Sequence, residues 1–234
     1  MFLYGHSMGG MITTSFMINN PKLNFTGLIL SAPLLGPTAY QNPMIKMFAL
    51  YAAPAIKEIL FKPPVDPMQV SRKKSYFNAA ITDKLTVPLL GGQQVGCITR
   101  FNYDMQHNAH LLKVPVQFHK GALDIIVSNK CIDTVYNKVK GEKSMHTYSY
   151  AKHELHIDAT KEMFDNIMGF MNSKLEANCP HLGELPSSFR TGLLPKREPC
   201  QHKGKLAAFA VICYYLIGFL LMKYKVVYGD RHGQ

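Results

Sequence analysis

Residues 2–10 read Phe-Leu-Tyr-Gly-His-Ser-Met-Gly-Gly, a pattern typical of a strand that turns sharply into a helix. The apolar run at 2–4 predicts a short strand, and the apolar spacing over 11–18 predicts a helix that ends at Asn19-Asn20-Pro21. Residues 5–9 between them have the pattern G-x-S-x-G, in which small residues allow a sharp turn from strand to helix. The serine then projects at the carboxyl end of the strand. We therefore predict that Ser7 is a nucleophile.

The rest of the first 175 residues alternates strands with helices around a long insertion. We expect strands at 26–31, 114–118 and 145–150, and helices at 129–140 and 159–175. Prolines punctuate residues 33–112, where short helical patterns such as 44–60 and 93–105 indicate a mostly helical insertion. Strands that alternate with helices indicate a parallel sheet covered on both faces. The predicted fold class is α/β, with a helical cap at about 36–110.

Two residues beyond the ends of predicted strands complete the chemistry that Ser7 needs. A serine nucleophile requires a base, and the base requires a residue that orients it. Asp124 follows the strand at 116–118, and His153 is the first histidine after the strand at 145–150. This order, Ser then acid then His, is typical of a nucleophile on a strand-to-helix turn. We predict that Asp124 orients His153, the general base, and that the N–H of Met8 stabilises the oxyanion.

Two of the neighbouring residues have other interpretations. Asp124 alternatively caps a helix at the surface. His156, three residues after His153, is expected to point elsewhere and to support its loop. Residues 153–156 read His-Glu-Leu-His, which is shorter than the H-E-x-x-H pattern of zinc enzymes. We therefore expect no metal site and no cofactor.

The composition is that of a globular protein. The chain has 234 residues and a formal net charge of +11, with 47% hydrophobic and 18% charged residues, which excludes a mainly disordered chain. No run of basic residues and no nucleic-acid-binding motif occurs in the sequence, so we expect no nucleic-acid partner. The basic surplus suits an anionic membrane surface. Five widely spaced cysteines fit neither a disulfide scaffold nor a zinc cluster.

The last 59 residues of the sequence (176–234) predict a membrane anchor. Prolines and glycines recur over 176–205, which we interpret as a linker. Residues 206–222 carry no charge and have lysines on both sides; as a helix they would span roughly 26 Å, enough for a thin bilayer core. The alternative is a buried core helix. We predict a single transmembrane helix at 206–222 and a short tail at 223–234, with the domain at 1–175 facing the cytosol.

Five short motifs occur in order along the chain: Gly-His-Ser-Met-Gly-Gly at 5–10, Leu-Ile-Leu-Ser-Ala-Pro at 28–33, Val-Ser-Arg-Lys at 70–73, Leu-Lys-Val-Pro-Val at 112–116 and Gly-x-x-Asp at 121–124. Together they resemble the motifs of the monoacylglycerol lipase and lysophospholipase group of α/β-hydrolases, which belongs with the serine aminopeptidase S33-like hydrolases. The resemblance covers residues 1 to about 175. It implies an α/β-hydrolase fold with Ser7 as nucleophile, Asp124 as acid and His153 as base, under a cap at 36–110.

The same resemblance implies that the chain is truncated at its N-terminus. Members of the group carry further sheet strands before the serine motif, and a His-Gly segment that donates a second oxyanion N–H. The expected function is cleavage of a lipid carboxylic ester, a monoacylglycerol or a lysophospholipid, through an acyl-enzyme. Two alternatives stay open: a catalytically impaired remnant that acts as a membrane-anchored interaction protein, and an acyltransferase. The expected partners are a lipid ester and the membrane, whereas the sequence indicates no particular protein partner.

Overall fold

A parallel sheet of four strands forms the centre of the described chain. The structure, a computed structural model, describes residues 1–56, 58–61, 66–83 and 89–178. The sheet has the order β1-β2-β5-β6 and contains β1 (Phe2–His6), β2 (Gly27–Ser31), β5 (Val116–Gly121) and β6 (Lys143–Tyr148). All three pairings are parallel. The α/β class expected from the sequence is confirmed.

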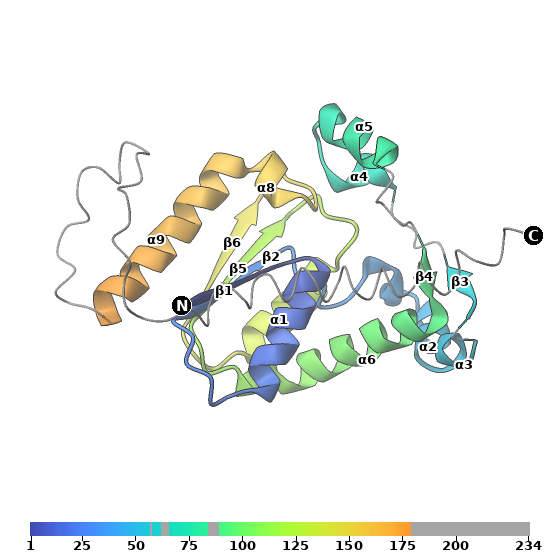
Figure 1. Cartoon of the computed structure of the whole chain (residues 1–234), viewed down its shortest axis with the longest axis horizontal. Coiled ribbons are helices and arrows are strands. Elements are labelled where there is room, and N and C mark those ends of the chain that lie inside the picture. Colours follow the sequence, from blue (N-terminus) through green and yellow to red (C-terminus); the bar gives the residue numbers. More distant parts are fainter. Residues whose placement is uncertain (57, 62–65, 84–88, 179–234) are drawn as a thin grey trace, which may run out of the picture. The chain divides into compact units, whose positions relative to one another are not determined.

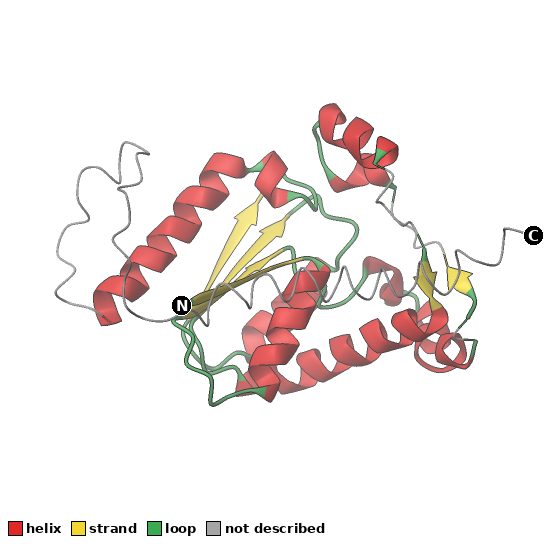
Figure 2. Ribbon diagram, viewed as in Figure 1, coloured by secondary structure: helices red, strands yellow, loops and turns green. Residues whose placement is uncertain are grey.

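Helices cover both faces of this sheet (Figures 1 and 2). The helices α1 (Met8–Asn19), α6 (Gly92–Asn108) and α7 (Asn129–Lys138) pack next to one another, and α9 (Thr160–Asn178) packs on the other face. Successive side chains of a strand point to opposite faces, so each strand contacts helices on both sides of the sheet. Phe118 of β5 meets Tyr136 of α7 with ring centroids 5.5 Å apart. Phe2 of β1 meets Phe170 of α9 at 6.0 Å.

The insertion between β2 and β5 is mostly helical, as expected. Its elements are η1 (Thr38–Gln41), α2 (Pro43–Met47), η2 (Phe48–Ala52), α3 (Ala53–Ala55), β3 (Leu60–Phe61), α4 (Pro67–Val70), α5 (Lys74–Thr82), β4 (Leu90–Gly91), α6 and η3 (Ala109–Leu111). The helical pattern expected over 44–60 is wrong at its end. Helical turns stop at Ala55, and Leu60 pairs with Gly91 in an antiparallel ladder instead. This long-range pairing overrides the local apolar spacing.

The predicted linker, transmembrane helix and tail fall on residues that the structure does not describe, apart from the first three residues of the linker, which end α9. Among the described helices, none combines the length and the apolar character needed to cross a bilayer. The prediction for residues 206–222 therefore stays a prediction.

A buried polar network lies within the sheet, at β5 and β6. His119 is completely buried, donates from Nε2 to Gln117 Oε1 (3.0 Å) and accepts at Nδ1 from the Tyr148 hydroxyl (2.8 Å). The ring of His146 stacks on that of His119 at 5.2 Å. Burial, with a smaller contribution from the charge of His146, lowers the pKa of His119 to about 3. The imidazole is therefore neutral at physiological pH, with both ring nitrogens hydrogen-bonded.

We expect this neutral histidine to make the protein less stable in acid. The pKa of His119 falls from 6.5 to about 3 on folding. The unfolded chain thus binds the extra proton between these values, and the free energy of unfolding decreases as the pH falls from 6.5 towards 3. The slope is at most about 1.4 kcal/mol per pH unit for one such group. Urea unfolding between pH 7 and pH 4 measures it.

The variant His119→Gln keeps a hydrogen-bonding side chain and cannot titrate, so its stability should depend less steeply on pH than that of the parent. His110→Gln changes an exposed histidine and serves as the control. Equal slopes in His119→Gln and the parent would contradict the prediction.

Candidate active site

Ser7 occupies a strained turn between β1 and α1. Its φ is 52° and its ψ is −120°, a backbone conformation that residues other than glycine rarely adopt. Its N–H donates to Ser31 O at 2.9 Å, and its own carbonyl accepts from the N–H of Leu34 at 2.8 Å. The neighbouring strand β2 and the loop after it therefore hold the turn in place.

The glycine before this turn is required by close packing. A Cβ at Gly5 would lie 2.4 Å from Thr13 Oγ1, 2.6 Å from Gly9 O and 2.8 Å from Gly10 Cα. Two of these atoms belong to the backbone of α1 and cannot move aside cheaply. Gly5 thus lets the first turn of α1 approach β1, whereas a Cβ at Gly9 would meet nothing within 4 Å.

The structure brings the three predicted catalytic side chains together. Ser7 Oγ lies 2.8 Å from His153 Nε2, and His153 Nδ1 lies 2.8 Å from Asp124 Oδ2. His153 and Asp124 are both buried. With Nδ1–H donated to the carboxylate, Nε2 accepts the serine proton. This is the geometry in which a neutral imidazole removes a proton from a hydroxyl.

Backbone amides hold the carboxylate of Asp124. Its Oδ1 accepts from the N–H groups of Ile126 (2.8 Å) and Val127 (3.1 Å), which leaves Oδ2 for His153. The alternative of a surface helix cap does not apply, because the side chain is 1% exposed and α7 is capped by Ser128. Asp124 therefore has a fixed orientation towards the imidazole.

The segment after β6 packs directly on the end of β5. We call residues 151–158, which include the short helix α8 (Leu155–Asp158), the base loop, because they contain His153, the predicted base. A Cβ at Gly121 would lie 2.3 Å from Lys152 O and 2.5 Å from Ala151 O, so the loop approaches the β5 backbone more closely than any side chain allows. Leu123 N–H also donates to Ala151 O at 3.0 Å. Asp124 and His153 are therefore held on two segments in direct backbone contact.

Met8 is the first residue of α1. The first N–H groups of a helix have no acceptor within the helix, so the Met8 N–H is available to a ligand beside Ser7. The positive end of the helix dipole lies at the same place. The position suits the oxyanion role that the sequence predicts.

The cap is attached to the base loop through the Val-Ser-Arg-Lys motif at 70–73. Asp158 Oδ1 accepts from Ser71 Oγ (2.8 Å) and from the N–H of Arg72 (3.0 Å). Glu154 N–H donates to Val70 O at 2.8 Å. A motif from the middle of the cap thus fixes the loop that carries His153.

Sequence reasoning missed the role of Glu154, which lies under the cap beside His153. Its Oε1 accepts from Tyr76 Oη (3.0 Å), and its Oε2 lies 3.3 Å from His6 Nε2 and 3.4 Å from His156 Nδ1. His156 supports its loop in this way and does not contact Ser7 Oγ, as expected. Because His6 is next to Ser7 and Glu154 is next to His153 in the sequence, both could have been predicted to lie near the site. Nothing in the local sequence indicates that Tyr76 contacts Glu154.

Burial and charge shift the pKa values in this cluster. Burial would raise the pKa of Glu154, but the hydrogen bonds and charges of its partners lower it below the usual value. Burial and the charge of Glu154 raise the pKa of Tyr76 to about 12. Burial lowers the pKa of His156, against the attraction of Glu154. At neutral pH the cluster therefore contains an ionised carboxylate and a protonated phenol.

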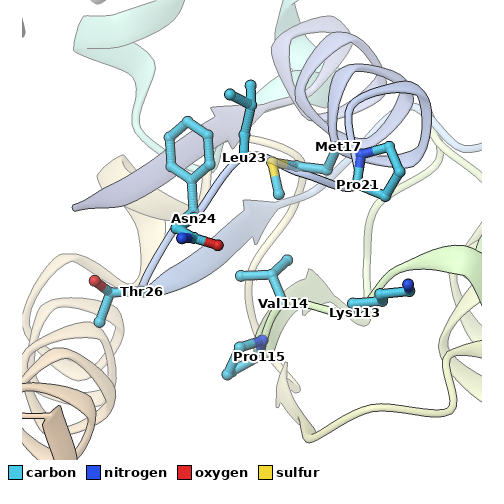
Figure 3. A pocket seen from close by; sticks show the side chains of 9 residues that line it. Met17, Pro21, Leu23, Asn24, Thr26, Lys113, Val114 and Pro115 are labelled. Carbon is cyan, nitrogen blue, oxygen red and sulfur yellow. The ribbon is translucent and has the colours of Figure 1, made fainter.

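A cavity of about 540 Å³ lies where the parallel strands begin, at the other end of the sheet from Ser7 (Figure 3). Thr26 and Pro115, which line it, precede β2 and β5. Ser7 and Asp124 follow strands of the same parallel sheet. The cavity is therefore separate from the candidate active site.

A model of the family described as "Serine aminopeptidase, S33" matches residues 1–160. The chain belongs to this family. The match includes the turn at Ser7, the whole cap and the base loop, so it contains every residue of the candidate site. A comparison with curated proteins found no match.

Solved structures of lipases and esterases share the fold. Monoacylglycerol lipase from Paleococcus ferrophilus has a TM-score of 0.68 and 22% identity over 74% of this chain and 68% of that chain. A soluble variant of monoglyceride lipase from Saccharomyces cerevisiae in complex with a substrate analog has a TM-score of 0.62 and 22% identity over 75% and 64%. A thermostable carboxyl esterase from Bacillus coagulans has a TM-score of 0.56 and 16% identity over 74% and 64%. The chain spans about two thirds of the length of these proteins, and the α/β-hydrolase fold is confirmed.

We expect Gly5→Ala and Gly9→Ala to have opposite effects, although both lie in the same short motif. At Gly5 the added methyl overlaps the backbone of α1. Such overpacking costs about 1–3 kcal/mol and should lower the melting temperature by several degrees. Gly9 lies in the first turn of α1 with open space around its Cα, so alanine should stabilise the helix by about 0.5–1 kcal/mol. Thermal unfolding of both variants and the parent measures the effect, and equal melting temperatures for the two variants would contradict the packing described here.

Proposed function

We propose that this chain is a serine hydrolase that cleaves carboxylic esters of lipids, a monoacylglycerol or a lysophospholipid, with Ser7 as nucleophile, His153 as general base and Asp124 as the residue that orients it. The observation that carries the proposal is the continuous hydrogen-bond chain from Ser7 Oγ through His153 to Asp124, at the tip of a strained turn. Membership of a hydrolase family supports it.

The first half of the proposed reaction forms an acyl-enzyme. His153 Nε2 takes the Ser7 proton while Oγ attacks the ester carbonyl, and the buried carboxylate of Asp124 stabilises the imidazolium that results. The carbonyl oxygen becomes negative in the tetrahedral intermediate, where the Met8 N–H stabilises it. His153 then returns the proton to the leaving alcohol. In the second half, water attacks the acyl-enzyme by the same steps and releases the fatty acid.

The lipid class of the substrate rests on three supporting observations. The serine motif Gly-His-Ser-Met-Gly-Gly and the cap motif at 70–73 resemble those of monoacylglycerol lipases. Two of the solved structures with this fold are themselves monoacylglycerol or monoglyceride lipases. The α2–η2 segment of the cap exposes apolar side chains, with Met44 80%, Met47 63% and Tyr51 71% exposed, as suits an enzyme that meets lipid.

We further propose that residues 206–222 anchor the hydrolase in a membrane as a single span, with the catalytic domain on the cytosolic side. The uncharged run and its flanking lysines support this proposal. An anchor would keep the active site close to its lipid substrate.

Fluorophosphonate labelling tests the proposed nucleophile. We expect the full chain, expressed in membranes, to be labelled covalently, and Ser7→Ala to lose the labelling completely because no other hydroxyl contacts His153 Nε2 among the described residues. Ser75→Ala, which removes an exposed serine of α5, is the matched control and should label like the parent. Asp124→Asn preserves the acceptor for Ile126 and Val127, so it should fold but react about 10⁴-fold more slowly.

The same preparations are then assayed with a monoacylglycerol, a lysophospholipid and an aminoacyl amide. Release of fatty acid that is lost in Ser7→Ala is the expected result. A folded parent that takes no label would refute the nucleophile. Labelling with cleavage of the aminoacyl amide alone would retain the nucleophile and refute the lipid substrate.

Arginines in the predicted span test the anchor. The double variant Ile212→Arg and Leu216→Arg should leave the membrane fraction on carbonate extraction, since each charge at the centre of a span costs about 2.5–3.5 kcal/mol. Val226→Arg with Val227→Arg adds the same charge outside the run and should remain in the membrane. Extraction of the parent itself would contradict the proposal.

A further inference from the structure

His6, Glu154 and His156 form a compact group of potential metal ligands beside the catalytic triad, and none of them belongs to it. One ligand atom from each residue, Nε2, Oε2 and Nδ1 respectively, lies within 4.8 Å of the other two. They come from the end of β1 and from the base loop, segments that the fold brings together. In the sequence, Glu154 stands between His153 and His156 in the stretch His-Glu-Leu-His, which by itself predicts no metal site. The fold places His6, and not His153, opposite Glu154 together with His156.

The distances suit a tetrahedral ion. Zinc bonds nitrogen and oxygen at about 2.0–2.1 Å, so two ligands on a tetrahedron lie about 3.3 Å apart, against about 3.0 Å on an octahedron. Glu154 Oε2 lies 3.3 Å from His6 Nε2 and 3.4 Å from His156 Nδ1. The side chain of His156 is 47% exposed, so its ring can turn to close the remaining gap between the two histidines.

One of these ligand atoms is buried without a hydrogen bond. His6 Nε2 is shielded from solvent and has no hydrogen-bond partner among the described residues, although the Glu154 carboxylate lies 3.3 Å away. Without hydrogen-bond geometry this buried nitrogen has only the electrostatic contact with Glu154, and a metal ion bound between the two side chains would coordinate it directly. Two histidines and one carboxylate are also the ligand set of many zinc sites that keep a fourth position for water. Exposed His156 leaves that position open to solvent.

Outer-shell contacts of the kind that metal sites need are already present. His6 Nδ1 lies 3.1 Å from Ser31 Oγ, so it can donate its proton there and direct the lone pair of Nε2 towards Glu154. Tyr76 Oη donates to Glu154 Oε1 and leaves Oε2 facing both histidines. Each inner ligand thus has its orientation fixed by a neighbour, except the exposed His156.

We propose that His6 Nε2, Glu154 Oε2 and His156 Nδ1 bind one zinc ion, with water as the fourth ligand. This site joins the nucleophile turn, through His6, to the base loop, through Glu154 and His156. The proposal does not depend on the reaction proposed above, because no ligand takes part in it.

Zinc binding by the full chain tests the site. The protein, purified without a histidine tag and treated with a chelator, is titrated with Zn²⁺ by calorimetry and with Co²⁺ by visible absorption. We expect one zinc per chain at this site, and intense visible bands from four-coordinate Co²⁺. His156→Ala removes one inner ligand and should weaken zinc binding at least tenfold, and Tyr76→Phe should weaken it about 10- to 100-fold through the loss of the outer-shell hydrogen bond.

The matched control is His110→Ala, which removes an exposed histidine from the cap and should bind zinc like the parent. Melting temperatures measured before each titration identify variants that fail to fold, and Tyr76→Phe retains the test if His156→Ala is one of them. A parent that binds no zinc would overturn the proposal. So would a parent whose zinc affinity and Co²⁺ spectrum are unchanged in both His156→Ala and Tyr76→Phe.

Discussion

Ser7 has a left-handed backbone conformation that several neighbouring segments must support. A left-handed φ costs a residue with a side chain about 1–2 kcal/mol, so the turn persists only where its surroundings hold it. Those surroundings are specific: Ser31 accepts the Ser7 N–H, Leu34 donates to the Ser7 carbonyl, and Gly5 lets α1 pack on β1. The alignment of β1 with β2 is therefore also what holds Ser7, the proposed nucleophile, in position.

The base loop is the second place where several segments meet. Gly121 lets the end of β5 approach the carbonyl groups of Ala151 and Lys152, which holds Asp124 beside His153. Asp158 accepts hydrogen bonds from the Val-Ser-Arg-Lys segment of the cap, and the Glu154 N–H donates one to it. Glu154 also faces His6, next to the nucleophile. Sheet, cap and nucleophile turn thus all contact the few residues around His153.

The sequence was sufficient for the features that local chemistry dictates. The turn at Ser7, the order of strands and helices, and the proximity of Asp124 and His153 follow from a short motif and from where parallel strands end. Contacts between distant segments were not predictable. Leu60 pairs with Gly91 where the apolar spacing favoured a helix. Tyr76 reaches Glu154 from an insertion whose path no local pattern determines.

The hydrogen bonds of the triad join residues that lie far apart along the chain. His153 is separated by 146 residues from Ser7 and by 29 from Asp124. Closing such long loops is slow, because the loss of chain entropy is offset only once the intervening structure has formed its contacts. A chain with a misfolded cap, a shifted strand or a detached base loop would contain Ser7, Asp124 and His153 and still lack the hydrogen bonds that join them. The reactivity of Ser7 is therefore a report on the folding of the whole domain, and a population of molecules can be sorted into native and non-native by that single serine.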